Sequence, residues 1–334
     1  MSETVAQPGT KEETLSIDTA TTRRDWPIAA AMINFPGVLP DGSSVQDQPV
    51  SGWEETLWQV VDAGFEYLDP TDSWLRVADL SPKRLADFEQ LLVKVGLKLG
   101  GISTARRSVI DVKYGEEYLA YGHRVIDTAA ALGVADVSFG LFQALTEAQK
   151  KALWFWTVPG HVDSPDPEVW KLAVRRFSEL ASHAREVNVH ISLEMYEDTY
   201  LGTADSSVRF LTDIDAENVW LNPDIGNLQR LHRPVEHWQT MIEKTVPFAR
   251  YWHVKNYFRT EDATSGAITT APAPMELGVI NYRMAVRHAI ALGFDGTFLC
   301  EHYGGDGLSV TATNREYLRR IIPRQTISAR PATN

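Results

Sequence analysis

The sequence predicts an α/β protein of the (β/α)₈ TIM-barrel class, and three observations lead to that prediction. From residue 25 onward, short apolar runs alternate with amphipathic stretches, which is typical of a βα series. Eight such runs are present, and eight parallel strands close a barrel of this class. The 334 residues, 44% of them hydrophobic, suffice for one barrel of about 250 residues with insertions.

The apolar runs are the predicted strands, in chain order Ile28–Ile33, Phe65–Leu68, Leu97–Ser103, Val134–Phe139, His190–Glu194, Val219–Asn222, Tyr251–Val254 and Thr297–Glu301. Between them, Pro82–Val95 and Glu168–Val187 carry apolar residues at helical spacing, and Ser81-Pro82 supplies an N-cap followed by a first-turn proline. Glycines directly before strands predict helix ends at Gly64, Gly96, Gly133 and Gly293.

The predicted barrel domain covers residues 25–323, between a polar N-terminal tail or arm (1–24) and a C-terminal tail (324–334). Residues 1–24 lack the apolar segment of a signal peptide, and no stretch reaches the length of a membrane span. A net charge of −12 disfavours nucleic acid as a partner. Cys300 is the only cysteine, which excludes an intrachain disulfide. A cytoplasmic protein with no membrane partner is therefore expected.

Four candidate metal ligands lie near the ends of four successive predicted strands. They are Glu194, Asp224, His253 and Glu301, separated by 30, 29 and 48 residues, where one barrel repeat takes about 30. The carboxyl ends of all barrel strands meet at one rim, so these side chains should converge. Three carboxylates and one imidazole suit one divalent cation that prefers oxygen ligands, such as Mn²⁺, Mg²⁺ or Co²⁺.

Four further side chains are candidates for chemistry or substrate contact. Lys255 shares a strand face with His253, where it would steady a developing enolate or form a salt bridge with a ligand carboxylate. His161 follows Pro159-Gly160 in a long loop and is a candidate general base. His232 and His302 are candidate substrate contacts, with structural roles as the alternative.

Two insertions lengthen loops on the rim where strands end, at residues 142–170 and 256–282. The first contains Trp154 and Trp156. These indoles could line a site for a flat ring or sugar face, or contact another chain, or simply pack on the barrel.

The ligand set and its spacing resemble the xylose-isomerase-like barrel superfamily, which includes sugar isomerases, ketose 3-epimerases and metal-dependent apurinic endonucleases. The resemblance covers about Asp25 to Ile321 and implies that Glu194, Asp224, His253 and Glu301 are its ligands. Two motifs depart from the pattern. A common D-x-G-H ends here in Asn227, and a common H-x-K-D ends in Asn256. These departures put the simple isomerase mechanism in doubt.

Longer phrases resemble the catalytic α subunit of bacterial C-glycoside deglycosidases; they are KALWFWTVPGH, LEMYEDTYLGTADS, LNPDIGNLQRLHRPVE, YWHVKNY, APAPMELGVINY and CEHYGGDGLS. This resemblance implies a hetero-oligomer with a small β-rich second subunit, Mn²⁺ or a similar ion, and a 3-oxo glycoside substrate. It also implies a catalytic histidine near the fourth strand, where this chain has Gly140-Leu141-Phe142-Gln143 instead.

The resulting prediction is a metal-dependent carbon–carbon lyase that cleaves 3-oxo C-glycosides by proton abstraction next to the ketone and elimination of the aglycone, with Glu194, Glu301, His161 and Lys255 as candidate catalytic residues. The alternative is a metal-dependent keto-sugar isomerase or epimerase, because the same enolate can be reprotonated. A phosphodiesterase acting on damaged DNA fits poorly with the acidic composition and the single ligand set. A non-catalytic scaffold fits poorly with the complete ligand set.

Overall fold

The barrel predicted from the sequence is confirmed. In the computed structural model, which describes residues 25–323, its parallel strands are β1 (Ile28–Ala31), β2 (Tyr67–Asp69), β3 (Lys98–Leu99) with β4 (Ile102–Ser103), β5 (Asp136–Phe139), β6 (His190–Glu194), β7 (Val219–Asn222), β8 (Trp252–Val254) and β11 (Phe298–Cys300). They form two arcs, β3-β2-β1-β11-β8 and β4-β5-β6-β7. Leu221 bridges Ala249 beside the seam between β7 and β8.

The third barrel strand differs from its prediction because it is divided into β3 and β4. Gly100 and Gly101 separate the two halves of the predicted Leu97–Ser103 strand. A Cβ on Gly101 would lie 2.7 Å from the ring of Tyr251, and one on Gly100 would lie 2.9 Å from the Cβ of Ala29. A side chain at either position would clash, so glycine permits this close packing of the divided strand against its neighbours.

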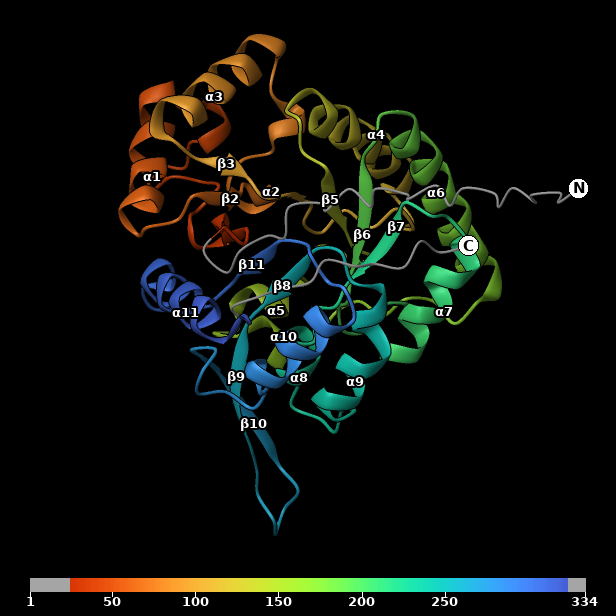
Figure 1. Cartoon of the computed structure of the whole chain (residues 1–334). Helices are drawn as coiled ribbons and strands as arrows, with labels where there is room; N and C mark the ends of the chain where they lie inside the picture. Colours follow the sequence, from red (N-terminus) through yellow and green to blue (C-terminus); the bar gives the residue numbers. More distant parts are fainter. Residues whose placement is uncertain (1–24, 324–334) are drawn as a thin grey trace, which may run out of the picture.

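The helices surround the barrel, as Figure 1 shows. They are α1 (Val50–Asp62), α2 (Thr71–Trp74), α3 (Pro82–Val95), α4 (Gly115–Ala131), α5 (Glu147–Lys151), α6 (Pro167–Glu186), α7 (Ala204–Ile214), α8 (Gly226–Gln229), α9 (Trp238–Thr245), α10 (Tyr282–Ala291) and α11 (Gly307–Ile321). The predicted bounds of α3 are confirmed, and α6 begins and ends one residue earlier than predicted. The Ser81 side chain caps α3, and Gly96 ends it in the left-handed region.

Two faces of the strands build two apolar clusters. Ile28, Ala30, Phe298 and Cys300 join the large core that includes the buried faces of the helices. Ala29, Ala31, Tyr251 and Leu299 form a smaller cluster on the other strand face. Cys300 is fully buried and packs in the large core. Among residues 25–323, no helix is both long enough and apolar enough to cross a membrane.

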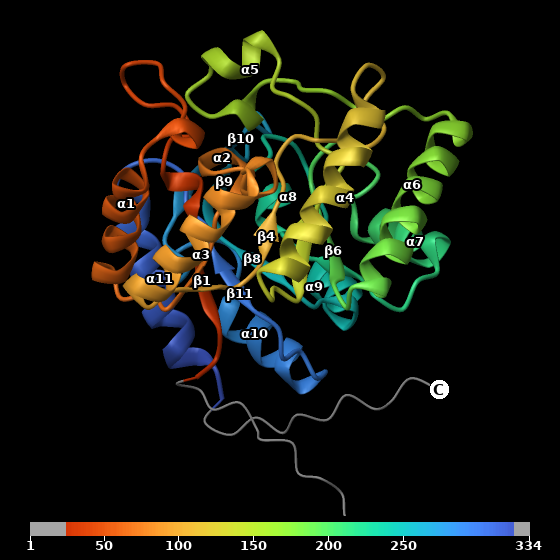
Figure 2. The ribbon, with the colours of Figure 1, turned by 90° about the horizontal axis from the view of Figure 1, so that it is seen from above.

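Both long insertions are ordered and carry secondary structure. The first contains α5 and a 3₁₀ turn at Phe155–Thr157, and α5 lies beyond one end of the barrel (Figure 2). The second forms an antiparallel hairpin of β9 (Asn256–Glu261) and β10 (Ile268–Ala273), which projects from the barrel in Figure 1. Arg259 ties the hairpin to the loop after α8 by donating to the carbonyls of Gln229, Leu231 and Arg233.

Candidate metal centre

The four predicted ligands converge at one rim of the barrel. Glu194 ends β6 and His253 lies on β8. Asp224 follows the end of β7 by two residues, and Glu301 is the first residue after β11. The Nδ1 atom of His253 is 3.5 Å from Glu194 Oε2, 3.9 Å from Asp224 Oδ2 and 3.3 Å from Glu301 Oε1. All four side chains are buried. The strand spacing in the sequence therefore predicted a real cluster.

The donor set fits a divalent cation. Within residues 25–323, His253 Nδ1 is buried without a well-formed hydrogen bond although three carboxylates surround it. Ligand atoms of Glu194, Asp224 and His253 all lie within 4.8 Å of one another, so these three groups could hold a metal ion. Burial works against a charge on His253, but Glu194 and Glu301 outweigh it and raise its pKa to about 10. A bound cation would replace that proton.

Lys255 adds a second cation to this cluster. Its ammonium donates hydrogen bonds to Asp224 Oδ2 and Glu301 Oε2, which is the salt bridge foreseen as the alternative to an enolate contact. Burial opposes the charge, yet the two carboxylates hold the pKa of Lys255 well above its usual range. Burial raises the pKa of Asp224 to about 7 despite Lys255. The charges of Lys255 and His253 overcome burial and hold the pKa of Glu301 below its usual range.

A relay of hydrogen bonds orients the His253 ring through Nε2, the nitrogen that does not face the carboxylates. Ser103 Oγ donates to Asp69 Oδ2 at 2.7 Å and lies 3.2 Å from His253 Nε2, so Nε2 donates its proton to Ser103 Oγ and Nδ1 faces the carboxylates. Tyr251 donates to the same carboxylate oxygen at 2.7 Å. Sequence reasoning missed Asp69 and Ser103, whose one available signal was a position at the end of the second and third barrel strands.

The two asparagines that depart from the superfamily motifs have defined partners. Asn227 Nδ2 donates to Glu194 Oε1 at 3.0 Å and to the carbonyl of Met195 at 2.9 Å, so it fixes a candidate ligand. Asn256 Nδ2 donates to the carbonyls of Met275 and Ile280, which holds the segment that leaves the β9–β10 hairpin. Asn227 therefore orients a candidate metal ligand, whereas Asn256 supports the loop beside the candidate site.

A cavity of about 250 Å³, called here the inner cavity, opens beside these groups. Glu194, His253 and Glu301 line it. The remaining lining side chains are mainly hydroxyl-bearing or aromatic, among them Thr71, Ser73, Thr104, Phe142, Phe155, Tyr196 and Tyr303. Hydroxyls that can donate or accept, together with apolar ring faces, suit a small polyhydroxylated molecule.

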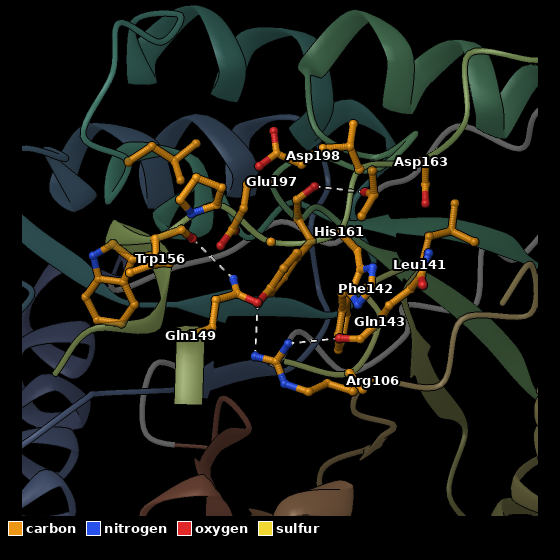
Figure 3. Close-up of a pocket in the computed structure, with 18 of the residues that line it drawn as sticks. Arg106, Leu141, Phe142, Gln143, Gln149, Trp156, His161, Asp163, Glu197 and Asp198 are labelled. Carbon is orange, nitrogen blue, oxygen red and sulfur yellow. Dashed lines mark hydrogen bonds between the residues drawn. The ribbon is translucent and has the colours of Figure 1, made fainter. Parts of the chain in front are cut away.

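A second cavity of about 310 Å³, the outer cavity, shares three wall residues with the inner one. They are Arg106, Phe142 and Tyr196, and the rings of Phe142 and Tyr196 stack at 4.5 Å. Figure 3 shows this cavity with Arg106 beside Phe142 and Gln143. The structure places both predicted residues His161 and His232 here rather than in the inner cavity. His161 therefore lines a different cavity from the candidate metal ligands Glu194, His253 and Glu301.

The other candidate substrate contacts also lie away from the inner cavity. Trp154 and Trp156 stack on each other at 5.1 Å, and Trp156 is buried while it lines the outer cavity. Trp156 packs against Leu231 and Tyr257, which fits the packing alternative more closely than an exposed aromatic wall. His302 is buried, which lowers its pKa, and lines neither cavity. Phe155, which lies between Trp154 and Trp156 and was not among the predicted site residues, lines the inner cavity instead.

The parallel barrel, with buried carboxylates and an imidazole clustered at the strand ends, places this chain among α/β barrels with a candidate metal site at that rim. Residues 58–321 match the family described as "Xylose isomerase-like TIM barrel". The chain therefore belongs to this family.

Solved structures with the same fold support that assignment. A xylose isomerase-like TIM barrel protein from Mycobacterium smegmatis, in complex with magnesium, is 47% identical, with a TM-score of 0.87 over 90% of this chain and 97% of that one. L-ribulose 3-epimerase is 16% identical, with a TM-score of 0.61 and coverage of 88% and 96%. D-allulose 3-epimerase from Methylomonas sp. is 15% identical, with a TM-score of 0.58 and coverage of 90% and 91%. The comparison with curated proteins found no significant match.

Replacing Ser103 by alanine should weaken divalent-metal affinity about 10- to 100-fold, because groups that orient a ligand typically contribute that much. The substitution removes the acceptor of His253 Nε2 and leaves the four proposed ligands in place. Calorimetric titration with Mg²⁺ and Mn²⁺ measures the change. Ser207→Ala, at a buried serine on α7, is the matched control and should leave the affinity unchanged. If both variants and the natural chain bind the metal with equal affinity, the hydrogen bond from His253 to Ser103 does not contribute to metal binding.

Proposed function

We propose that this chain is a metal-dependent enzyme that moves a proton on the carbon next to a carbonyl of a sugar-like substrate, as a keto-sugar isomerase or epimerase. The observation that carries this proposal is the buried cluster around His253 Nδ1, which opens onto the inner cavity. Glu194, Asp224, His253 and Glu301 would hold one Mg²⁺ or Mn²⁺ ion. When bound, such an ion polarises a carbonyl and lowers the energy of the enolate.

Glu194 and Glu301 are the proposed proton carriers. Both line the inner cavity, and they come from strands separated in the barrel by β7 and β8, so a substrate there could meet two separate carboxylates. Two carriers are what epimerisation requires, because one removes the proton and the other returns it to the opposite face. Lys255 keeps Glu301 ionised through its hydrogen bond. Asn227 holds Glu194 in place.

Solvent-exchange measurements test this proposal. The metal-loaded chain, incubated with a panel of free ketoses in deuterium oxide, should incorporate deuterium next to the carbonyl and form the epimer or isomer. Glu194→Gln should abolish both signals, because glutamine has nearly the same shape as glutamate but cannot carry the proton. Failure of every ketose to exchange, with metal demonstrably bound, would reject the isomerase or epimerase function.

A second candidate function is cleavage of 3-oxo C-glycosides, and the shared wall between the two cavities favours it. A keto-sugar in the inner cavity would leave the outer cavity for its aglycone. In this reaction a carboxylate removes the C2 proton, a C1–C2 double bond forms, and the bond from C1 to the aglycone carbon breaks. The released electron pair stays on that carbon, which gains a proton.

This second candidate also includes Mn²⁺ as the metal and a small β-rich partner subunit. The test supplies the chain, Mn²⁺ and an oxidised C-glycoside, with and without the co-expressed small subunit. Release of free aglycone only from the 3-oxo sugar, increased by the subunit, is the expected result. If no aglycone forms while free ketoses exchange deuterium, the lyase function fails and the isomerase or epimerase function stands.

A further inference from the structure

Arg106 occupies the junction between the inner and outer cavities. It follows β4 by three residues and has a backbone φ of 56°, in the region that residues other than glycine rarely adopt. Its side chain lines both cavities, a position shared only with Phe142 and Tyr196 among their described lining residues. Unfavourable backbone conformations of this kind persist where surrounding contacts impose them, and they concentrate at functional sites.

The contacts of Arg106 hold its guanidinium in place but use only some of its N–H donors. Nη1 donates to the carbonyl of Gln143 and Nη2 to the hydroxyl of Tyr196, both at 3.1 Å. The guanidinium lies 4.9 Å from the ring centroid of Phe155, so a ring face supports it. An arginine has five N–H donors. Within residues 25–323 these two hydrogen bonds therefore leave donors of Arg106 for a further acceptor.

The charge of Arg106 is also uncompensated, unlike that of its neighbours. Arg107 pairs with Asp72, Arg230 pairs with Glu197, and Arg233 pairs with Asp198. Among the described residues, no carboxylate lies within salt-bridge distance of Arg106. A half-buried guanidinium that neighbouring aromatic rings shield from water, and that lacks an acidic partner, is suited to an anionic oxygen.

We propose that Arg106 binds an anionic oxygen of the substrate, a phenolate or a carboxylate, on a second part that extends from the inner into the outer cavity. This inference rests on the second candidate function, the cleavage of 3-oxo C-glycosides, and deepens it, because it assigns a residue and an acidic oxygen to the part of the substrate outside the sugar. The reacting keto-sugar end occupies the inner cavity. The acidic oxygen lies close to the bond that joins the two parts, since Arg106 stands where the cavities meet.

Binding measurements on the metal-loaded full chain test the role without requiring turnover. The probes are an unoxidised C-glucosyl flavone with free phenols, its O-methylated counterpart, and a C-glucosyl benzoate. Arg106→Gln should raise the dissociation constant of at least one acidic probe tenfold or more and leave the methylated probe unchanged. The acidic probe that responds identifies the oxygen as phenolate or carboxylate. Arg233→Gln is the control, because Arg233 also lines the outer cavity but is already paired.

Three results would overturn the proposal: no binding of either acidic probe to the natural chain, equal weakening of the methylated and acidic probes by Arg106→Gln, or equal effects of Arg106→Gln and Arg233→Gln. Ala144→Trp gives an independent check, because Ala144 is exposed and lines only the outer cavity. It should weaken all three probes, whereas Ala148→Trp on α5 should not. If Arg106→Gln weakens an acidic probe as expected while no aglycone is released from the 3-oxo C-glycoside, this inference stands and the lyase function fails.

Discussion

Replacing His253 by alanine should abolish metal binding and all metal-dependent turnover. The expected loss of affinity exceeds about 100-fold, because removing groups that only orient a ligand already costs about 10- to 100-fold. His253 supplies the single nitrogen of the proposed site, and its Nδ1 lies within 4 Å of all three carboxylates. Calorimetric titration with Mg²⁺ and Mn²⁺ measures the affinity, and circular dichroism reports whether the barrel persists.

The matched control is His288→Ala on α10, which removes an imidazole outside both cavities and should change neither affinity nor turnover. The barrel should survive His253→Ala, because the large apolar core does not include this side chain. If the His253→Ala variant still binds stoichiometric metal with unchanged affinity, the ion binds at another site. Loss of metal together with loss of the circular dichroism signal would instead require Glu194→Gln as the deciding variant.

Topology explains why the ligand cluster was predictable from the sequence. In a closed parallel barrel, residues at the carboxyl ends of strands must meet at one rim, so Glu194, Asp224 and His253 could be grouped by spacing alone. The same argument reached Lys255 through strand alternation. The glycine exits were predictable for a local reason, since positive φ at Gly96 and Gly133 follows from how helices end.

Loop paths explain what the sequence did not reveal. His161 and Phe155 lie in the same insertion, yet only Phe155 reaches the inner cavity, and no periodic pattern encodes that difference. Ser103 and Asp69 act through one short relay between neighbouring strands, and such small polar residues are common at strand ends. Arg106 gains its position from an unusual φ, which is a property of the folded loop rather than of its residue type.

The second large expected effect is on stability and concerns Arg230. This arginine is fully buried, and its Nη2 donates to both carboxylate oxygens of Glu197 at 2.8 Å. The rings of Phe155 and Trp156 lie within about 5 Å of its guanidinium, and Glu197 outweighs burial to hold the pKa of Arg230 well above its usual range. Arg230 therefore stays charged, and Glu197 is its acidic partner in the described part of the chain.

Glu197→Gln should destabilise the protein by about 3–5 kcal/mol, because it leaves a buried charge without its counter-ion while preserving the side-chain shape. Asp198→Asn is the matched control at the adjacent position, since its partner Arg233 is 51% exposed and such pairs contribute about 0–1 kcal/mol. Denaturant unfolding of both variants measures the difference. Equal midpoints would mean that the aromatic rings and the solvent already compensate Arg230. A large shift confined to Glu197→Gln would show that this buried ion pair contributes to the stability of the whole fold.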